Sequence, residues 1–487
     1  MRYPTIWITV FIAVVCCLPA GPAGAQDDAA ENLDEIMEGF DDEAFGVEGT
    51  QNQDAPLTES DILQGFEEEA PAKDLPAAAQ SPGITPLRLN GELAFTAVYN
   101  VSADANEPWR GVSMLRPELE LTLKYKFSEQ WRFQVGARGF YDAIYSIEGR
   151  DEYTSQVRDE YEKELELKDT FIQGSLTDHL DIKLGRQIVP WGTLDNLRVT
   201  DVLNPLDLRL PGLTDIDDLR LPVAMAKLDY YWGNWDLSAM VIPEVRFSQT
   251  PVYGSDFYPY AELPPAEEIP ADGVDDAQYA AALTGVFQGW DLGFYGASLY
   301  ADQAYGEPLA GAASPQMVGR HARLKMAGAA ANIALGNWLV KAETAWWDGL
   351  RYTHTPGEEH ERLDLGLGLE YSGFSETTLS LEAALRHLFD FTATLEQPPG
   401  SLRENQVQWA LRFVRDFLND TLTLNLLAGS FGQKIEDGMF ERLDAEYDLT
   451  DSVSIRGGIV MYQTGSTGRY QEVDGLDRLF LVCKYSF

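Results

Sequence analysis

The sequence predicts an all-β fold, a transmembrane antiparallel up-and-down β-barrel of 18 strands, with 16 strands as the alternative. Three observations predict it. The first residues have the pattern of a secretory signal, and no later stretch is apolar over the roughly 18 residues of a membrane-spanning helix. From residue 87 onward, period-two strands are joined by alternating short turns and longer connections. A membrane protein without spanning helices has to close its sheet, because lipid satisfies no open backbone edge.

The N-terminal segment is expected to be a cleaved signal peptide, residues 1–25. Met1 and Arg2 form a short basic start, and an apolar run of signal length follows at residues 6–18. Small residues then stand at Ala23 and Ala25. We therefore expect cleavage before Gln26 and export of the chain.

The C-terminal segment reads as a membrane strand. Leu479, Leu481, Cys483, Tyr485 and Phe487 alternate with a second set of residues at period two, which is typical of a strand with one apolar face. A terminal phenylalanine with Tyr two positions earlier resembles the closing strand by which bacterial outer-membrane proteins are recognised. We therefore expect Phe487 to engage the barrel-insertion machinery.

Residues 87–487 are assigned to the barrel. Trp131, Trp235, Trp290 and Trp338 each follow a short turn directly. Because an indole is favoured at a membrane interface, these turns are expected at one height at one end of the barrel. An even strand count then places both ends of the barrel in the periplasm. The expected strands are 88–100, 114–127, 130–146, 163–176, 179–188, 222–232, 234–243, 278–288, 290–302, 318–333, 337–349, 359–372, 376–389, 405–417, 420–431, 438–449, 452–464 and 475–487.

Composition excludes several classes of protein. The formal net charge is -42, which disfavours nucleic-acid binding because phosphates require a basic face. Removal of the signal leaves Cys483 as the last of three cysteines, so no disulfide framework is expected. The five histidines share no metal-ligand spacing, and no metal or other cofactor is predicted.

Residues 26–86 are expected to form a disordered acidic tail in the periplasm. Residues 26–84 contain 17 acidic residues and one basic residue. An internal repeat relates residues 34–43 to residues 60–69, and each copy places an Ile and a Phe four residues apart, on one face of a helical turn. The repeat is interpreted as a partner-docking motif presented twice, or alternatively as an acidic linker with an accidental duplication. The docking residues would be Ile36, Phe40, Ile62 and Phe66.

The barrel interior is predicted to be polar and hydrated. Apolar residues such as Leu119 and Leu365 are assigned to the lipid side, and residues of opposite parity to the lumen. Charges of both signs in the lumen can line a water-filled channel or pair across strands and stabilise the wall. The basic residues assigned to the lumen are Arg323, Lys325, Lys341, Arg386, Arg412, Arg442, Arg456 and Arg478. Other charged residues of lumen parity include Glu118, Glu120, Lys124, Arg132, Arg138, Glu343, Glu370, Glu382, Asp444 and Lys484.

One long connection, residues 189–221, differs in character from the others. Apolar and charged residues alternate irregularly along it, and a loop of this length is usually functional or disordered. We expect it to fold into the barrel as a constriction or plug. Its ion pairs could instead hold it against neighbouring loops without contact to a solute. The residues assigned to it are Arg186, Trp191, Asp195, Arg198, Asp201, Asn204, Asp207 and Arg209.

Residues 185–209 also carry a resemblance. The series Gly-Arg-Gln, Trp-Gly, Asp, then Arg-Val-x-Asp-Val-x-Asn-Pro-x-Asp resembles the signature of a family of proteobacterial outer-membrane β-barrels of poorly defined function. Members of that family are often encoded near RND-type exporters of lipids or other hydrophobic molecules. The resemblance implies a barrel in the outer membrane of a Gram-negative bacterium, and by analogy a transport role.

These observations favour an outer-membrane channel or conduit within a trans-envelope transport system for lipidic or other hydrophobic molecules. Its acidic tail would dock a periplasmic or inner-membrane partner. A general or substrate-selective porin for small solutes is the alternative, and a non-conducting structural barrel is a third. An enzyme is disfavoured, because no nucleophile accompanies a histidine in a recognisable motif.

Overall fold

The computed structural model describes residues 87–101, 111–259, 263–309, 317–397, 401–433, 435–465, 473 and 476–487. The signal peptide and the repeat-bearing tail lie outside the described residues, as do Ile36, Phe40, Ile62 and Phe66. No helix in the described part of the chain has the length and apolar character needed to cross a bilayer.

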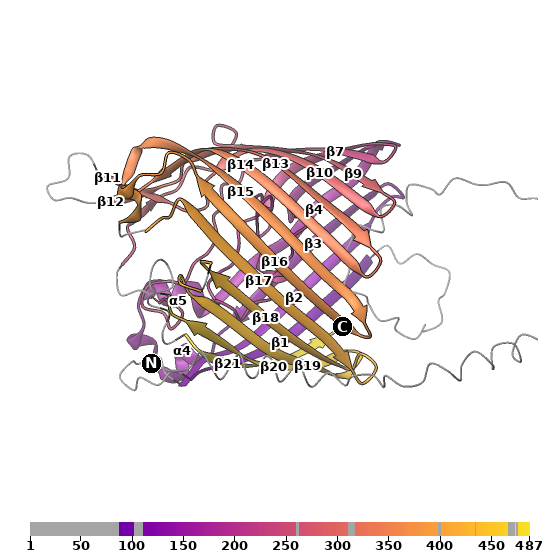
Figure 1. Cartoon of the computed structure of the whole chain (residues 1–487). Helices are drawn as coiled ribbons and strands as arrows, with labels where there is room; N and C mark the ends of the chain where they lie inside the picture. Colours follow the sequence, from indigo (N-terminus) through magenta and orange to yellow (C-terminus); the bar gives the residue numbers. More distant parts are fainter. Residues whose placement is uncertain are drawn as a thin grey trace, which may run out of the picture. The chain divides into compact units, whose positions relative to one another are not determined.

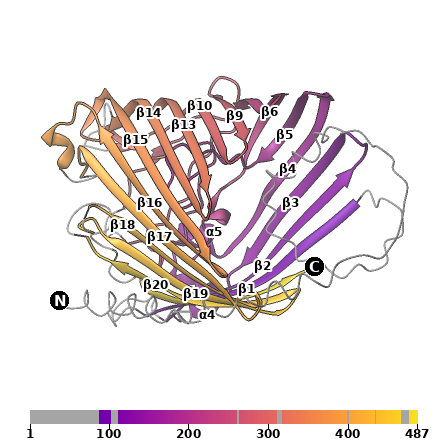
Figure 2. The same ribbon diagram turned by 45° about the vertical axis from the view of Figure 1, so that its right-hand side comes forward.

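Eighteen strands form one antiparallel barrel (Figures 1 and 2). They are β1 (Leu87–Asn100), β2 (Gly111–Lys126), β3 (Trp131–Tyr141), β4 (Lys163–Thr177), β5 (Leu180–Gln187), β6 (Val223–Trp232), β7 (Trp235–Ile242), β9 (Gln278–Phe287), β10 (Trp290–Tyr300), β13 (Arg323–Leu335), β14 (Trp338–Tyr352), β15 (Thr355–Phe374), β16 (Thr377–Leu388), β17 (Asn405–Phe417), β18 (Leu422–Phe431), β19 (Met439–Thr450), β20 (Val453–Gln463) and β21 (Arg478–Ser486). The predicted count of 18 is therefore confirmed, and the alternative of 16 is wrong.

The barrel closes by pairing of its first and last strands. β1 pairs with β2 on one side and with β21 on the other, so no strand edge stays open. At the seam, Gly91 and Phe487 exchange two backbone hydrogen bonds of 2.9 Å. A Cβ on Gly91 would lie 2.3 Å from the ring of Phe487, so this glycine leaves room for the terminal side chain. Leu87 pairs with Tyr125 near a short turn, so β1 begins at the same end of the barrel at which β21 finishes.

The outer face of the barrel is apolar. Leu119, Leu365 and Leu367 are exposed, as the alternation of the sequence predicts. Trp131, Trp235, Trp290 and Trp338 are each the first residue of their strand, after a short turn. A belt of indoles at one end of an apolar wall is the arrangement found at a membrane interface.

Two expected strands differ most from the structure, whereas the ends of the others lie within four residues of expectation. The strand expected at 130–146 ends at Tyr141, because the chain turns inward into the short helices α4 (Ile144–Glu148) and α5 (Ser155–Tyr161). The strand expected at 318–333 is two elements, β12 (Met317–Arg320) and β13, separated by His321 and Ala322. β12 pairs instead with β8 (Glu267–Glu268) and β11 (Tyr305–Pro308) in a separate small sheet.

Two hydrophobic clusters lie inside the barrel. The first joins residues of the β5–β6 connection to inward side chains of β6, β7, β9, β10, β13 and β14. The second joins α4, α5 and Phe257 to inward side chains of β1, β2, β20 and β21, with Leu210 and Leu213 packed against it. Three segments therefore fold into the lumen: the β3–β4 connection with α4 and α5, the β5–β6 connection, and the β7–β9 connection with Phe257. The β5–β6 connection contributes to both clusters.

Candidate functional site

The candidate site is the connection between β5 and β6, residues 188–222, which we call the inner loop. It contains one short 3-10 helix, η3 (Asp217–Leu219). Its backbone and side chains reach β16 on one side and β4 on the other. These two strands are nine positions apart in the ring of eighteen, so they face each other across the lumen. The inner loop therefore spans the barrel interior.

Glu343 of β14 holds the first half of the inner loop. Its Oε1 accepts the backbone N–H groups of Thr193 and Leu194, the latter at 2.8 Å. Its Oε2 accepts the N–H of Thr200 at 3.0 Å and the hydroxyl of the same residue at 2.7 Å. Glu343 is 5% exposed, so one buried carboxylate satisfies donors from two ends of a turn. Gly192 has φ +88°, and a Cβ there would lie 2.4 Å from Glu343 Oε1. Both the backbone conformation and the lack of space explain why a glycine follows Trp191.

Glu382 of β16 holds the tip of the inner loop. Its two oxygens accept the N–H groups of Asp195, Asn196 and Leu197 at 2.8–2.9 Å. The side chain is fully buried. Three successive amides aimed at one carboxylate form a fixed anion-binding turn, so this carboxylate fixes both the position and the conformation of the tip.

Apolar contacts complete the first half of the inner loop. Trp191 is buried and stacks on Tyr295 of β10, with ring centroids 4.9 Å apart. Leu194 packs over β15 at Gly366 and Gly368, where an added Cβ would lie 2.6 and 2.8 Å from its methyl groups. These two glycines in the wall thus form the space that the loop's leucine occupies.

The second half of the inner loop is held by charges. Arg209 is 4% exposed and donates to Asp207 at 2.7 Å and to Glu164 of β4 at 2.9 Å. Arg138 of β3 lies 3.6 Å from Asp207. Burial raises the pKa of Asp207, but the hydrogen bond and charge of Arg209 outweigh burial and hold that pKa below its usual value. The pair therefore contributes stability at neutral pH, and this contribution is lost only as the pH falls through the lowered pKa.

Asp215 joins the inner loop to a third part of the wall, on β19 and β20. Its carboxylate accepts from Arg442 of β19 at 2.8 Å and from Arg456 of β20 through two nitrogens. Both arginines also contact Asp444. The inner loop is therefore fixed at three places on the wall, by Glu343 with Glu382, by Glu164, and by this pair of arginines.

The remaining assigned loop residues stabilise the loop itself. Asp201 accepts the N–H of Trp191 and pairs with Arg220 at 3.0 Å. Arg198 lies 3.2 Å from Asp201 and donates to the backbone oxygen of Asn204 at 2.9 Å. The buried Asn204 side chain accepts from Val189 and donates to the carbonyl oxygens of Gln187 and Leu221, which joins the two ends of the loop.

Arg186 belongs to strand β5 and not to the inner loop. It shares the parity of the exposed Leu184, whereas the neighbouring Gln187 is fully buried. Its guanidinium pairs with Glu244, which follows β7. The structure therefore separates Arg186 from the other residues that were assigned to a constriction.

Arg323 and Lys325 do not face the lumen, and their assignment to it was wrong. Leu324 and Met326, which alternate with them in β13, are 4% exposed and belong to the cluster that includes Trp191. The parity rule placed the apolar residues of this strand on the lipid side. It fails here because the inner loop gives the lumen an apolar surface of its own.

The other basic residues assigned to the lumen do lie on the inner face. Lys341 pairs with Asp195 of the loop and lies 3.7 Å from Glu370, and Arg386 donates to the backbone oxygen of Arg198 at 3.4 Å. Arg412 shares the parity of the buried Ala410. Arg478 is 1% exposed and lies 3.2 Å from Asp256. Arg442 and Arg456 hold Asp215, as described above.

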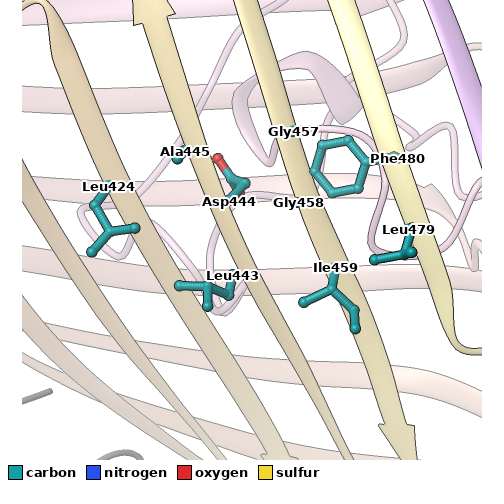
Figure 3. Close-up of a pocket in the computed structure, with 9 residues that line it drawn as sticks. All are labelled: Leu424, Leu443, Asp444, Ala445, Gly457, Gly458, Ile459, Leu479 and Phe480. Atoms are coloured by element: carbon teal, nitrogen blue, oxygen red, sulfur yellow. The ribbon is translucent and has the colours of Figure 1, made fainter.

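A hollow lies among β18, β19, β20 and β21 (Figure 3). Its lining includes Leu424, Leu443, Ile459 and Leu479, together with the buried Asp444 and Phe480. Leu443 and Leu479 are among the exposed apolar residues of the outer face. The hollow is therefore lined largely by residues of the apolar outer face, and also by Asp444, which contacts Arg442 and Arg456.

The roles of three functional residues were not identified from the sequence. Asp215 was omitted, although it lies in the loop and is the group that binds two wall arginines. Glu343 and Glu382 were placed in the lumen correctly by parity, but not as the acceptors for the loop backbone. No local signal marks these contacts, since their partners are about 150 and 190 residues away in sequence.

A closed ring of 18 strands, an apolar outer face and a lumen occupied by the chain's own loop define a transmembrane β-barrel of the bacterial outer-membrane type. The chain belongs to the family described as "Protein of unknown function (DUF1302)", whose model matches residues 7–487. No curated protein sequence matches it.

Several solved outer-membrane proteins have a similar fold. OccK9 (OpdG) of Pseudomonas aeruginosa has a TM-score of 0.49 and 12% identity, with 82% of this chain and 97% of that chain covered. A BenF-like porin from Pseudomonas fluorescens Pf-5 has a TM-score of 0.48 and 11% identity, covering 82% and 98%. OccAB2 of Acinetobacter baumannii has a TM-score of 0.47 and 10% identity, covering 82% and 97%. At this level the likeness carries no argument about function.

Proposed function

We propose that the protein is a conduit of the outer membrane that is closed at rest and carries lipidic or other hydrophobic molecules as part of a trans-envelope transport system. The observation that carries this proposal is the inner loop, which spans the lumen and is fixed to the wall at three places. A general diffusion pore has a polar, water-filled interior. Here one sector of the inner wall is apolar and covered by Trp191, Leu194, Val199 and Leu203.

Displacement of the inner loop would expose this apolar sector. Met225, Met240 and Met326 lie in it among alanines. Methionine side chains are flexible and adapt to apolar partners of different shape. An apolar lane bounded by charged residues fits an amphiphilic or hydrophobic cargo better than a small polar solute.

A closed barrel requires a partner or a cargo that opens it. Leu87 lies at the short-turn end, which is the periplasmic end of barrels of this class. The acidic tail that precedes it would then be available to a periplasmic or inner-membrane partner. Barrel insertion through Phe487, and residence in the outer membrane, complete the proposal.

Single-channel conductance of the refolded protein in a planar bilayer tests this function, with and without residues 26–84. We expect both forms to be closed or nearly so, because the inner loop belongs to the barrel and not to the tail. Steady open conductance in both forms would contradict a closed conduit. It would favour the second candidate, a substrate-selective porin. The inward charges of β1–β5 and β19–β21 are the observation that supports this candidate, because such charges can line a water-filled channel.

Changing Phe40 and Phe66 together to alanine is expected to weaken capture of the partner by about tenfold or more, because each repeat would lose its large apolar side chain. Co-purification from cross-linked envelopes measures this effect. Changing Glu48 and Asp54, which lie between the repeats, to Gln and Asn provides the control. Unchanged capture by the double phenylalanine variant would sink the docking role of the repeat.

A further inference from the structure

Two basic side chains lie on the outer face of β13. They are Arg323 and Lys325, which alternate with the buried Leu324 and Met326, and we call them the outer basic pair. The side chain of Lys325 is 75% exposed. A base on the lipid face of a barrel is costly at the middle of the bilayer and is tolerated near its two interfaces. The height of the pair on the wall therefore decides which part of the membrane it meets.

The outer basic pair lies at the interface opposite to the tryptophan belt. Trp338 of that belt is directly opposite Leu335, and Lys325 stands ten residues from Leu335 along β13. At about 3.3 Å per residue and a strand tilt of about 35–45°, such a length rises by roughly 25 Å, which is the height of the apolar band of such barrels. Between the two levels, the outer face of β13 consists of Ala327, Ala329, Ala331 and Ile333. Lys325 therefore stands where the hydrocarbon layer ends.

Aromatic side chains on the neighbouring strands indicate the same height. Figures 1 and 2 show β13 between β10 and β14. Tyr279 of β9 and Lys325 are both directly opposite Ser298 of β10, so the three residues form one row across the wall. Tyr279 is exposed, as is Trp346 of β14, which is opposite Ala327 in the next row. Exposed Tyr and Trp side chains at one level are typical of the aromatic girdle at a membrane interface.

The two bases flank a small polar residue, Ser298. Arg323 Nε donates to the Ser298 hydroxyl at 3.2 Å, and another nitrogen of its guanidinium donates to the carbonyl oxygen of Ala277 at 2.7 Å. The guanidinium also lies over the ring of Tyr300, 4.8 Å from the centroid. These neutral groups hold Arg323 in one orientation and leave its charge in place. A phosphate over Ser298 would lie between this fixed charge and the mobile ammonium of Lys325.

Two carboxylates lie near the outer basic pair. Asp348 lies 3.3 Å from Lys325, but both side chains are partly exposed, and an exposed ion pair contributes little. Asp276 accepts the Tyr300 hydroxyl through its side chain at 2.7 Å and meets Arg323 through its backbone oxygen at 3.3 Å. Because Lys325 has a flexible stem, it can turn from Asp348 toward an anion of higher charge.

The wall just below the outer basic pair is built of small residues. Ala281 of β9, Gly296 of β10 and Ala327 of β13 are opposite one another in the next row of the outer face. The nearest atom to a Cβ added on Gly296 is a backbone oxygen at 3.9 Å, so the surface is open there. An acyl chain can therefore lie against the wall in this row, beside the exposed Trp346.

We propose that the outer basic pair binds the phosphate of a membrane lipid whose acyl chains lie against the small residues below it. The pair lies at the end of the barrel with the long connections, which is the external end in barrels of this class, so the lipid would belong to the outer leaflet. Arginine supplies planar donors that match phosphate oxygens, and lysine adds a mobile charge. The inference requires a barrel in a bilayer and is independent of what passes through the lumen.

Native mass spectrometry of the full chain in a neutral detergent tests the site with two lipids that have the same oleoyl chains. Dioleoyl phosphatidylglycerol contains a phosphate, and dioleoylglycerol does not. The wild type is expected to bind the phosphatidylglycerol at least about tenfold more tightly than dioleoylglycerol. The double variant Arg323→Gln with Lys325→Gln is expected to lose that preference, because both charge-assisted contacts are removed.

A charge-matched control changes two bases on the lumen side at the short-turn end. Arg88 shares the parity of the buried Val98 in β1, and Lys126 shares the parity of the buried Met114 in β2. Arg88→Gln with Lys126→Gln is expected to bind both lipids like the wild type.

A conservative variant separates the role of charge from that of the particular side chains. Arg323→Lys with Lys325→Arg keeps both charges and is expected to retain most of the preference for phosphatidylglycerol. Equal affinity of the wild type and the double glutamine variant for phosphatidylglycerol would overturn the proposal, as would equal affinity of the wild type for the two lipids. Displacement of phosphatidylglycerol by an equal concentration of inorganic phosphate would also overturn it, since the pair would then bind a free anion and not a lipid.

Discussion

Changing Glu343 and Glu382 together to alanine is expected to release the first half of the inner loop while the barrel stays folded. Each carboxylate accepts three backbone N–H groups of the loop, and both are buried. A buried donor left without its acceptor costs roughly 1–3 kcal/mol. The released loop should therefore open more often, by a factor of roughly 10–100 or more.

Limited trypsin digestion of the folded protein measures this release through the rate of cleavage after Arg198. Glu446→Ala is a matched control, since Glu446 is an inward carboxylate that accepts a hydrogen bond from Ser454 within the wall. Cleavage after Arg198 at the wild-type rate in the double variant would show that the carboxylates do not hold the loop.

Deletion of residues 192–215, with a short Gly-Ser linker in their place, is expected to raise single-channel conductance several-fold. β5 and β6 pair directly with each other along eight residues, so the barrel closes without the inner loop. The deletion removes the contacts to Glu343, Glu382, Arg442 and Arg456 and uncovers the apolar sector. Water and ions should then enter a lumen that the loop occupied.

A matched control for the deletion replaces residues 264–271 of the β7–β9 connection by a Gly-Ser linker of equal length. These residues contribute to neither hydrophobic cluster, so conductance is expected to stay at the wild-type level. If the deletion of 192–215 left conductance unchanged in a folded barrel, the inner loop would not be the element that closes the lumen.

Most of the barrel could be predicted because the sequence patterns that specify its strands and turns are local. Alternation of apolar residues with period two, a Trp after each of four turns and a terminal Phe are all visible in short windows of sequence. They follow from the need to face lipid on one side and to place indoles at an interface. The 18 strands accordingly agree with expectation, apart from the inward turn after Tyr141 and the break at His321.

The wrong assignment of two basic residues in β13 to the lumen has a physical reason. Parity assigns the apolar face of a strand to lipid only if the opposite side is water. In β13 the opposite side is the inner loop, so Leu324 and Met326 are inside while Arg323 and Lys325 are outside. A contact between segments far apart in sequence thus reversed an assignment that local pattern alone would make.

The sequence by itself determined that this chain forms a membrane barrel, with 18 strands or the alternative of 16, and which loop is distinct. These properties depend on periodicity and on side chains that meet lipid or its interface. Only the tertiary structure decided where that loop lies and what holds it. Its backbone amides are satisfied by Glu343 and Glu382, and its Asp215 by Arg442 and Arg456. Those partners are brought together by closure of the barrel, because a ring of 18 paired strands places distant parts of the chain across one lumen.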